Sequence, residues 1–196
     1  MFIHHGLSPL PIKLEGIKEK KNTPIKNCYL SHRKALMLAK NRNWPFVCIF
    51  EDDAYPRNGI VDELNKYLSK IPDKCGVLIL GNYRLIEFSM FNKLFFNRVV
   101  CWGSHAYVVF RKDYDNYIRF LDSVKIADCF QRIERKIINP LDFFIPSKNL
   151  FIQYSPQRGV SGINGYLWHC FGRRLTKEEI HDRGFPYIEE LTNVTP

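Results

Sequence analysis

The sequence lacks an apolar run long enough to cross a bilayer, and no basic stretch followed by an apolar one opens it. Neither a membrane-spanning protein nor a secreted precursor is therefore indicated. The chain also lacks a C-x-x-C pair, because its six cysteines are scattered. Several of them lie in apolar stretches, so we expect reduced core thiols of a cytoplasmic protein, and neither a disulfide framework nor a zinc site.

Nucleic-acid motifs such as paired Cys/His residues or an RNA-binding aromatic signature are missing as well, so we expect no nucleic-acid partner. The charge nevertheless favours an anionic partner, since 29 basic and 20 acidic residues give a net charge of +9. A nucleotide or a peripheral contact with an anionic membrane would satisfy it. A plainly solvated lysine-rich face is the alternative interpretation.

The order of apolar segments predicts an α/β protein with a mixed, mostly parallel, Rossmann-type sheet flanked by helices. We expect a single domain over residues 1–175, and a C-terminal helix and tail over 176–196. The Phe-rich stretch 84–97 is expected to be a loop or flap. The remaining pattern predicts helices at 29–43, at 61–71 and around 114–121, and strands at 46–50, 76–81, 105–110 and 150–154.

The most informative feature is the junction between Phe46–Phe50 and three consecutive carboxylates. Five apolar residues, two of them aromatic and two β-branched, predict a fully buried strand. Glu51, Asp52 and Asp53 at its end repel one another, and a cation would compensate. Oxygen ligands on a short turn suit Mg²⁺ or Mn²⁺. A solvated acidic turn or the start of a helix is the alternative.

Several short motifs follow one another in order over roughly residues 10–165, and together they resemble glycosyltransferase family 25. This is the lipopolysaccharide-type family that includes the collagen galactosyltransferases. The motifs are Asn27-Cys28-Tyr29-Leu30-Ser31-His32, Phe50-Glu51-Asp52-Asp53-Ala54, Leu78-Ile79-Leu80-Gly81, Gly103-Ser104-His105-Ala106-Tyr107-Val108-Val109, Pro140-Leu141-Asp142-Phe143-Phe144, and Pro156-Gln157 with Ser161.

The resemblance implies a GT-A fold and inverting transfer of a hexose, most often galactose from UDP-galactose. The acceptor would be a lipopolysaccharide or other cell-surface glycan, lipid-linked and met at the inner membrane face. Met1–Gly6 is too short to supply both the family's usual first strand and its Arg-rich turn, so this region is expected to be shortened. A catalytically inactive relative that binds a sugar or nucleotide is therefore the alternative function.

Site roles follow from the chemistry of sugar-nucleotide transfer, which must stabilise a departing diphosphate. We expect Asp53 as the direct metal ligand, with Glu51 and His169 completing the metal shell. Glu51 and Asp52 could instead contact the donor, and an ion pair with a lysine is the structural alternative for Glu51. His105, Gln157 and Ser161 are further expected donor contacts. For His105, a role in the protein core is the alternative.

The general base must be a carboxylate tuned towards neutral pH by burial. Asp142 is our choice, because it stands between Leu141 and Phe143 in an apolar setting and matches the family's "PVD" position. A helix N-cap after Pro140 is the alternative, and Asp128 is the competing carboxylate. For His32 we expect a hydrogen-bonded structural role.

Overall fold

The computed structural model describes residues 1–4, 12–22, 24–52, 54–82, 84–102, 105–123 and 142–153. Within these residues the helices are α1 (Pro24–Asn41), α2 (Ile60–Leu68) and α3 (Tyr114–Ser123). The strands are β1 (Phe2–His4), β2 (Ile12–Lys13), β3 (Phe46–Phe50), β4 (Ala54–Pro56), β5 (Val77–Gly81), β6 (Arg84–Met90), β7 (Phe95–Trp102), β8 (Ala106–Phe110), β9 (Phe143–Pro146) and β10 (Phe151–Gln153).

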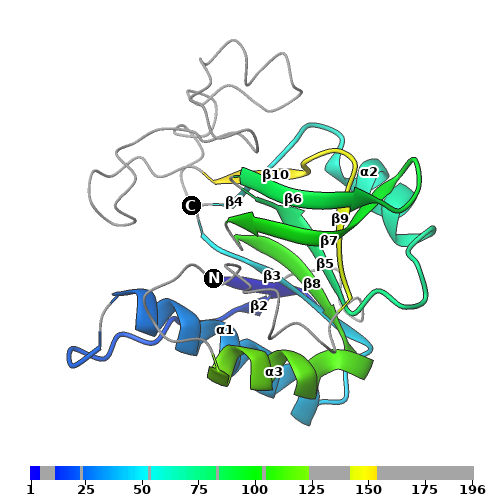
Figure 1. Cartoon of the computed structure of the whole chain (residues 1–196). Helices are drawn as coiled ribbons and strands as arrows, with labels where there is room; N and C mark the ends of the chain where they lie inside the picture. Colours follow the sequence, from blue (N-terminus) through cyan, green and yellow to red (C-terminus); the bar gives the residue numbers. More distant parts are fainter. Residues whose placement is uncertain are drawn as a thin grey trace.

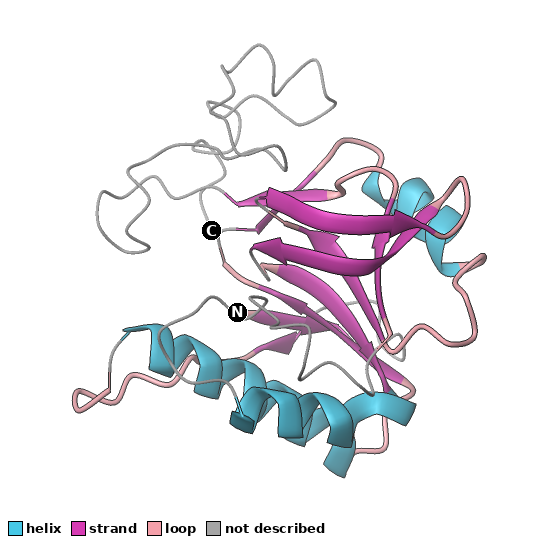
Figure 2. Ribbon diagram, viewed as in Figure 1, coloured by secondary structure: helices cyan, strands magenta, loops and turns pink. Residues whose placement is uncertain are grey.

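These strands form one sheet with helices on both faces (Figure 1). Its main path is β2-β1-β3-β8-β5-β9-β7-β6, while β10 pairs with both β4 and β5. Helices α1 and α3 lie side by side on one face, and α2 lies apart from them at the far end of the molecule (Figure 2). The predicted α/β class is confirmed.

The strand directions differ from the prediction of a mostly parallel sheet. Of the nine strand pairs in the described residues, only β5 with β9 and β5 with β10 are parallel. The central strand β8 runs antiparallel to both β3 and β5. A strand buried on both faces shows the same apolar run in either direction, which is why the sequence pattern could not reveal this.

Three expected strands, at 46–50, 76–81 and 105–110, are confirmed as β3, β5 and β8 and form the middle of the sheet. Their side chains alternate between two buried clusters, as the two-residue period of a strand requires. On the α1/α3 face lie side chains such as Ile49 and Tyr107, and on the α2 face lie Leu78 and Val108.

Helix α1 begins earlier than the predicted residue 29, at Pro24, and proline is a favoured first helical residue. Its buried Ala35, Leu36 and Ala39 pack in the cluster on the α1/α3 face. The predicted stop before β3 is confirmed, because Asn43 has a φ of 53° and Pro45 follows. The early start places Cys28 inside the helix.

The stretch 84–97, predicted to be a loop or flap, is instead the hairpin of β6 and β7. The side chain of Asn92 stabilises its turn, because Oδ1 accepts hydrogen bonds from the N–H groups of Leu94 and Phe95 at 2.8 and 2.9 Å. Asparagine commonly closes turns in this way. The hairpin was missed because its ladder contains irregularities at Leu85–Glu87 and Glu87–Ser89, which break the alternation.

The remaining predictions are mostly confirmed. The expected helices at 61–71 and 114–121 are α2 and α3, and the late strand is β10. β1 is a short strand, where we expected a shortened or missing one. The helix predicted from residue 176 lies outside the described residues. In the part of the chain that is described, no helix combines the length and apolar character needed to cross a bilayer.

Candidate functional site

Three chain segments meet at the carboxyl end of β3. The Glu51 N–H donates to the His105 carbonyl oxygen at 2.8 Å, which ties the residue after β3 to the residue before β8. Gly81, the last residue of β5, is paired with Ala106 on one side and Phe151 on the other. The three acidic residues Glu51, Asp52 and Asp53 therefore begin where the ends of β3, β5, β8 and β10 meet.

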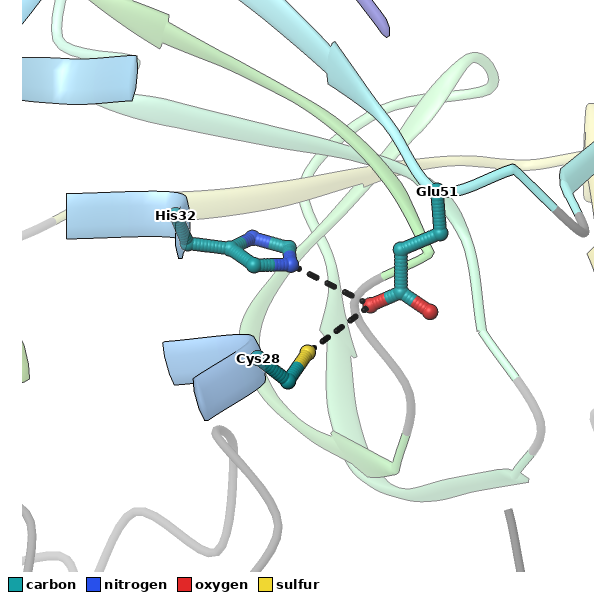
Figure 3. Close-up of side chains that lie close together, drawn as sticks. All are labelled: Cys28, His32 and Glu51. Atoms are coloured by element: carbon teal, nitrogen blue, oxygen red, sulfur yellow. Dashed lines mark hydrogen bonds and ion pairs between the residues drawn. The ribbon is translucent and has the colours of Figure 1, made fainter. Parts of the chain in front are cut away.

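Cys28, His32 and Glu51 converge at this edge, and we refer to them as the Cys28–His32–Glu51 cluster (Figure 3). Cys28 and His32 are four residues apart on α1, so they project from one side of the helix. Glu51 Oε1 lies 3.3 Å from His32 Nε2 and 3.9 Å from Cys28 Sγ. One ligand atom from each residue falls within 4.8 Å of the others, close enough for all three to hold one metal ion.

Tyr107 holds the other side of the His32 ring. Its hydroxyl oxygen lies 2.7 Å from His32 Nδ1, and the two rings stack with an interplanar angle of 7°. Burial raises the pKa of Tyr107 well above its ordinary value, so this hydroxyl stays neutral at physiological pH. The hydrogen bond and the stacking fix the orientation of His32, so the predicted hydrogen bonding of this residue is confirmed.

Glu51 is ionised in this setting. Burial alone would raise its pKa, but the hydrogen bond from His32 and the nearby His32 and His105 together lower the pKa below the ordinary 4.5. The side chain of Glu51 is 19% exposed and that of His32 only 1%. The largely buried Glu51 carboxylate, the first residue of the acidic turn, is therefore held by the fully buried His32 imidazole.

His105 is buried beside this pair. Its Nε2 lies 3.3 Å from the carbonyl oxygen of Phe151, and burial lowers its pKa despite the opposing effect of Glu51. Gly81 makes room for the ring, because a Cβ there would lie 2.3 Å from His105 Nε2 and 2.9 Å from Phe151 Cβ. The residue thus joins β8 to β10 inside the protein. Its predicted contact with the donor stays a prediction.

The other predicted ligands are only partly described. Asp52 is exposed on the turn that follows β3. The predicted residues Asp53, Asp128, Gln157, Ser161 and His169 lie outside the described residues. Sequence reasoning missed Cys28 and Tyr107. The four-residue spacing between Cys28 and His32 could have revealed the first, had the helix been predicted to start before residue 29.

Asp142 does not lie with this cluster. Its carbonyl oxygen accepts hydrogen bonds from the N–H groups of Gly76 and Val77, at the amino end of β5. Glu51 follows the carboxyl end of β3, which is separated from β5 by β8 and runs in the same direction as β5. Asp142 and Glu51 therefore lie at opposite ends of these strands, and four strand residues alone separate the two ends by about 13 Å. The Asp142 side chain is exposed, so the predicted apolar burial is wrong. The alternative helix N-cap is also wrong, because strand β9 follows.

A buried strand of the mixed sheet thus ends in an acidic turn, and a comparison with known proteins assigns the family. The model of glycosyltransferase family 25, described as a lipopolysaccharide biosynthesis protein family, matches residues 22–155. This match spans most of the chain, and the chain therefore belongs to glycosyltransferase family 25. No curated protein matches it. The resemblance predicted from the motifs is confirmed, and with it the assignment as a glycosyltransferase enzyme.

Proposed function

We propose that this glycosyltransferase is a metal-dependent, inverting hexosyltransferase of GT-A type. It would move a hexose, galactose from UDP-galactose being the first choice, onto a lipopolysaccharide or other cell-surface glycan. The observation that carries the proposal is the position of Glu51–Asp53 directly after the central strand β3, with Asp52 exposed. In layered α/β proteins, ligands gather at such strand ends.

The donor would be held at the acidic turn. Carboxylate oxygens suit Mg²⁺ or Mn²⁺, and the exposed Asp52 would hold such an ion together with Asp53, with His169 as a further ligand. When bound, the ion would neutralise the charge that develops on the departing diphosphate. Glu51 would serve mainly to orient the turn, because its Oε1 already faces His32 and Cys28.

A thermal-shift titration tests the donor site. The melting temperature is measured with UDP, UDP-galactose, UDP-glucose and their N-acetyl forms, in Mn²⁺ or in EDTA, because a ligand of the folded state raises it. We expect an increase that requires the metal and is lost in Asp53→Asn. Asp73→Asn, which alters an exposed carboxylate elsewhere, should keep it. The absence of a shift with every UDP-sugar would overturn the proposal.

The alternative function, a sugar- or nucleotide-binding relative without activity, is favoured by the three-residue length of β1. The two functions differ in one measurement. Release of UDP from a UDP-sugar that shifts the melting temperature, in the presence of bacterial lipopolysaccharide acceptors, supports transfer. Binding without UDP release, across Mn²⁺ and Mg²⁺, supports the inactive relative.

We also propose peripheral contact with an anionic membrane, where a lipid-linked acceptor would be met on the cytoplasmic side. The net charge of +9 supports it, as does the tip of the β6–β7 hairpin. There Met90 is 74% and Phe91 41% exposed, and Lys74 Nζ lies 4.9 Å from the Phe91 ring centroid. Apolar side chains beside lysines suit an anionic headgroup layer.

Vesicle flotation tests this contact. Wild-type protein should float with anionic vesicles and release as salt is raised, because the attraction to the headgroups is screened. A Met90→Ser, Phe91→Ser variant should float less than Val61→Ser, which removes another exposed apolar side chain, 66% exposed on α2. Flotation that is insensitive to salt, or equal in both variants, would contradict the contact.

A further inference from the structure

The Cys28–His32–Glu51 cluster has a donor set that differs from the one predicted for the acidic turn. It offers one sulfur, one nitrogen and one oxygen from two elements, α1 and the end of β3. Mg²⁺ and Mn²⁺ prefer oxygen ligands, whereas thiolate and imidazole ligands suit Zn²⁺. The cluster is therefore a poor site for the donor's cation and a suitable one for a softer metal.

The separations between the ligand atoms are near those of a tetrahedral metal site, with the sulfur slightly too far away, since all three atoms lie within 4.8 Å of one another. With Zn–N and Zn–O near 2.1 Å and Zn–S near 2.3 Å, ligand atoms of a tetrahedral site stand about 3.3–3.7 Å apart. Here Glu51 Oε1 lies 3.3 Å from His32 Nε2 and 3.9 Å from Cys28 Sγ. Binding would require the Cys28 thiol, which is only partly buried, to move closer to the other two ligand atoms.

The surroundings of His32 resemble those of a metal-ligating histidine. Such a residue usually has its second ring nitrogen hydrogen-bonded, which fixes the ring and presents the other nitrogen to the metal. In this protein Nδ1 contacts the Tyr107 hydroxyl at 2.7 Å, and Nε2 faces Glu51. A thiolate and a carboxylate together would also balance the two charges of the ion.

We propose that Cys28, His32 and Glu51 bind a zinc ion that fastens α1 to the end of β3. Binding replaces the thiol proton of Cys28, which leaves to solvent, and a water molecule would take the fourth position. The zinc would hold the root of the acidic turn in place and is separate from the cation at the donor. This inference does not depend on the identity of the sugar or the acceptor.

Metal binding to the purified full chain tests the proposal. After EDTA treatment and removal of the chelator, the protein is dialysed against Zn²⁺ and its metal content is measured. Co²⁺ is added in parallel, because a bound cobalt–thiolate gives a charge-transfer absorption that reports a sulfur ligand. We expect about one zinc per chain and this absorption in the wild type, since each site has one set of ligands.

Two variants show whether Cys28 is the sulfur ligand. Cys28→Ala should lose the cobalt–thiolate absorption and bind zinc at least about 10-fold more weakly, the low end for loss of a metal ligand's support. Cys75→Ala, which removes a buried thiol outside the cluster, should keep both. Circular dichroism confirms that each variant is folded, and His32→Gln replaces Cys28→Ala if that variant is unfolded.

Several outcomes would overturn the proposal. The first is that the wild type binds no stoichiometric zinc. The second is that Cys28→Ala binds zinc as tightly as the wild type. Equal loss in Cys75→Ala would assign the metal elsewhere. A failure here is distinguishable from failure of the proposed function, because zinc content and the Mn²⁺-dependent UDP shift are measured separately on the same wild-type protein, and either can be absent while the other is present.

Discussion

Glu51 Oε1 and His32 Nε2 lie 3.3 Å apart across the contact between β3 and α1. This pair joins the first residue of the acidic turn to a helix that packs on the sheet through buried side chains such as Leu36. A second hydrogen bond, between His32 Nδ1 and the Tyr107 hydroxyl, continues the connection to the central strand β8. The position of the turn thus depends on a polar chain that runs through the protein interior.

Removing the imidazole should therefore destabilise the protein. His32→Ala leaves the largely shielded Glu51 carboxylate without this partner, and we expect the free energy of unfolding to fall by about 2–4 kcal/mol. Tyr107→Phe, which removes only the hydroxyl, should cost about 1–2 kcal/mol. Urea denaturation measures both, and a smaller loss for His32→Ala than for Tyr107→Phe would show that the pair contributes little.

Gly81→Ala should destabilise the same edge of the sheet. The added Cβ would lie 2.3 Å from His105 Nε2, and the buried ring has no open space to move into because Phe151 is also close. Overpacking of this kind costs about 1–3 kcal/mol. Gly16→Ala is the matched control, since its nearest neighbour would be Ser31 Oγ at 3.5 Å, and it should change the free energy of unfolding by less than about 0.5 kcal/mol. Similar effects of both would argue against close packing at Gly81.

Stability should fall as the solution is acidified. The pKa of His105 is lowered from its ordinary 6.5 by burial, so below that pH the unfolded state takes up a proton that the folded state does not. The contribution of neutral His105 to the free energy of unfolding is fully present above the pKa that this residue has in the unfolded chain. It is lost as the pH falls towards the lower pKa of the folded protein, by up to about 1.4 kcal/mol per pH unit. The lowered pKa of Glu51 adds a further loss below 4.5.

Unfolding free energies between pH 8 and pH 5 measure the histidine contribution. In His105→Asn the decline between these pH values should be shallower than in the wild type, because one titrating group has been removed. The other histidines are common to both proteins, so the difference between the two curves isolates His105. Curves with identical slopes would contradict the assignment of the lowered pKa to this residue.

Asp142→Asn should retain transferase activity. Its side chain is exposed at the amino end of β5, whereas the acidic turn lies at the opposite end, so a direct role as base requires it to act across the sheet. We expect kcat/KM within about threefold of the wild type, against a loss of 10²–10⁴-fold, roughly what removal of a general base costs. A loss in the larger range, with UDP-sugar binding intact, would restore Asp142 as the base.

Much of the fold could be predicted because its central strands are short, apolar and bounded by breakers. Pro45 precedes β3 and Gly81 ends β5, so the sequence indicates where β3 begins and where β5 ends. The relative directions of the strands could not be predicted, because an apolar run does not indicate which strand it will pair with. The β6–β7 hairpin lies between β5 and β8 in the chain, and it turns β8 antiparallel to β5.

Less of the site could be predicted, for a reason that concerns one residue. The helix was expected to begin at residue 29, which left Cys28 in an irregular segment with no fixed relation to His32. The structure starts α1 at Pro24 and places the two side chains on one side of the helix. Glu51 was expected at the edge of a donor site, and its contact with His32 arises only when α1 packs on β3. No spacing in the sequence encodes that contact.

The sharing of β3, β5 and β8 between two cores has a consequence for cooperativity. Ile49 and Tyr107 belong to the core beneath α1 and α3, and their strand neighbours Cys48 and Val108 belong to the core beneath α2. Neither core can melt while these strands stay paired, and neither can survive their separation. The two faces should therefore unfold in one step. Any redesign of the α1 face is thus also a redesign of the α2 face.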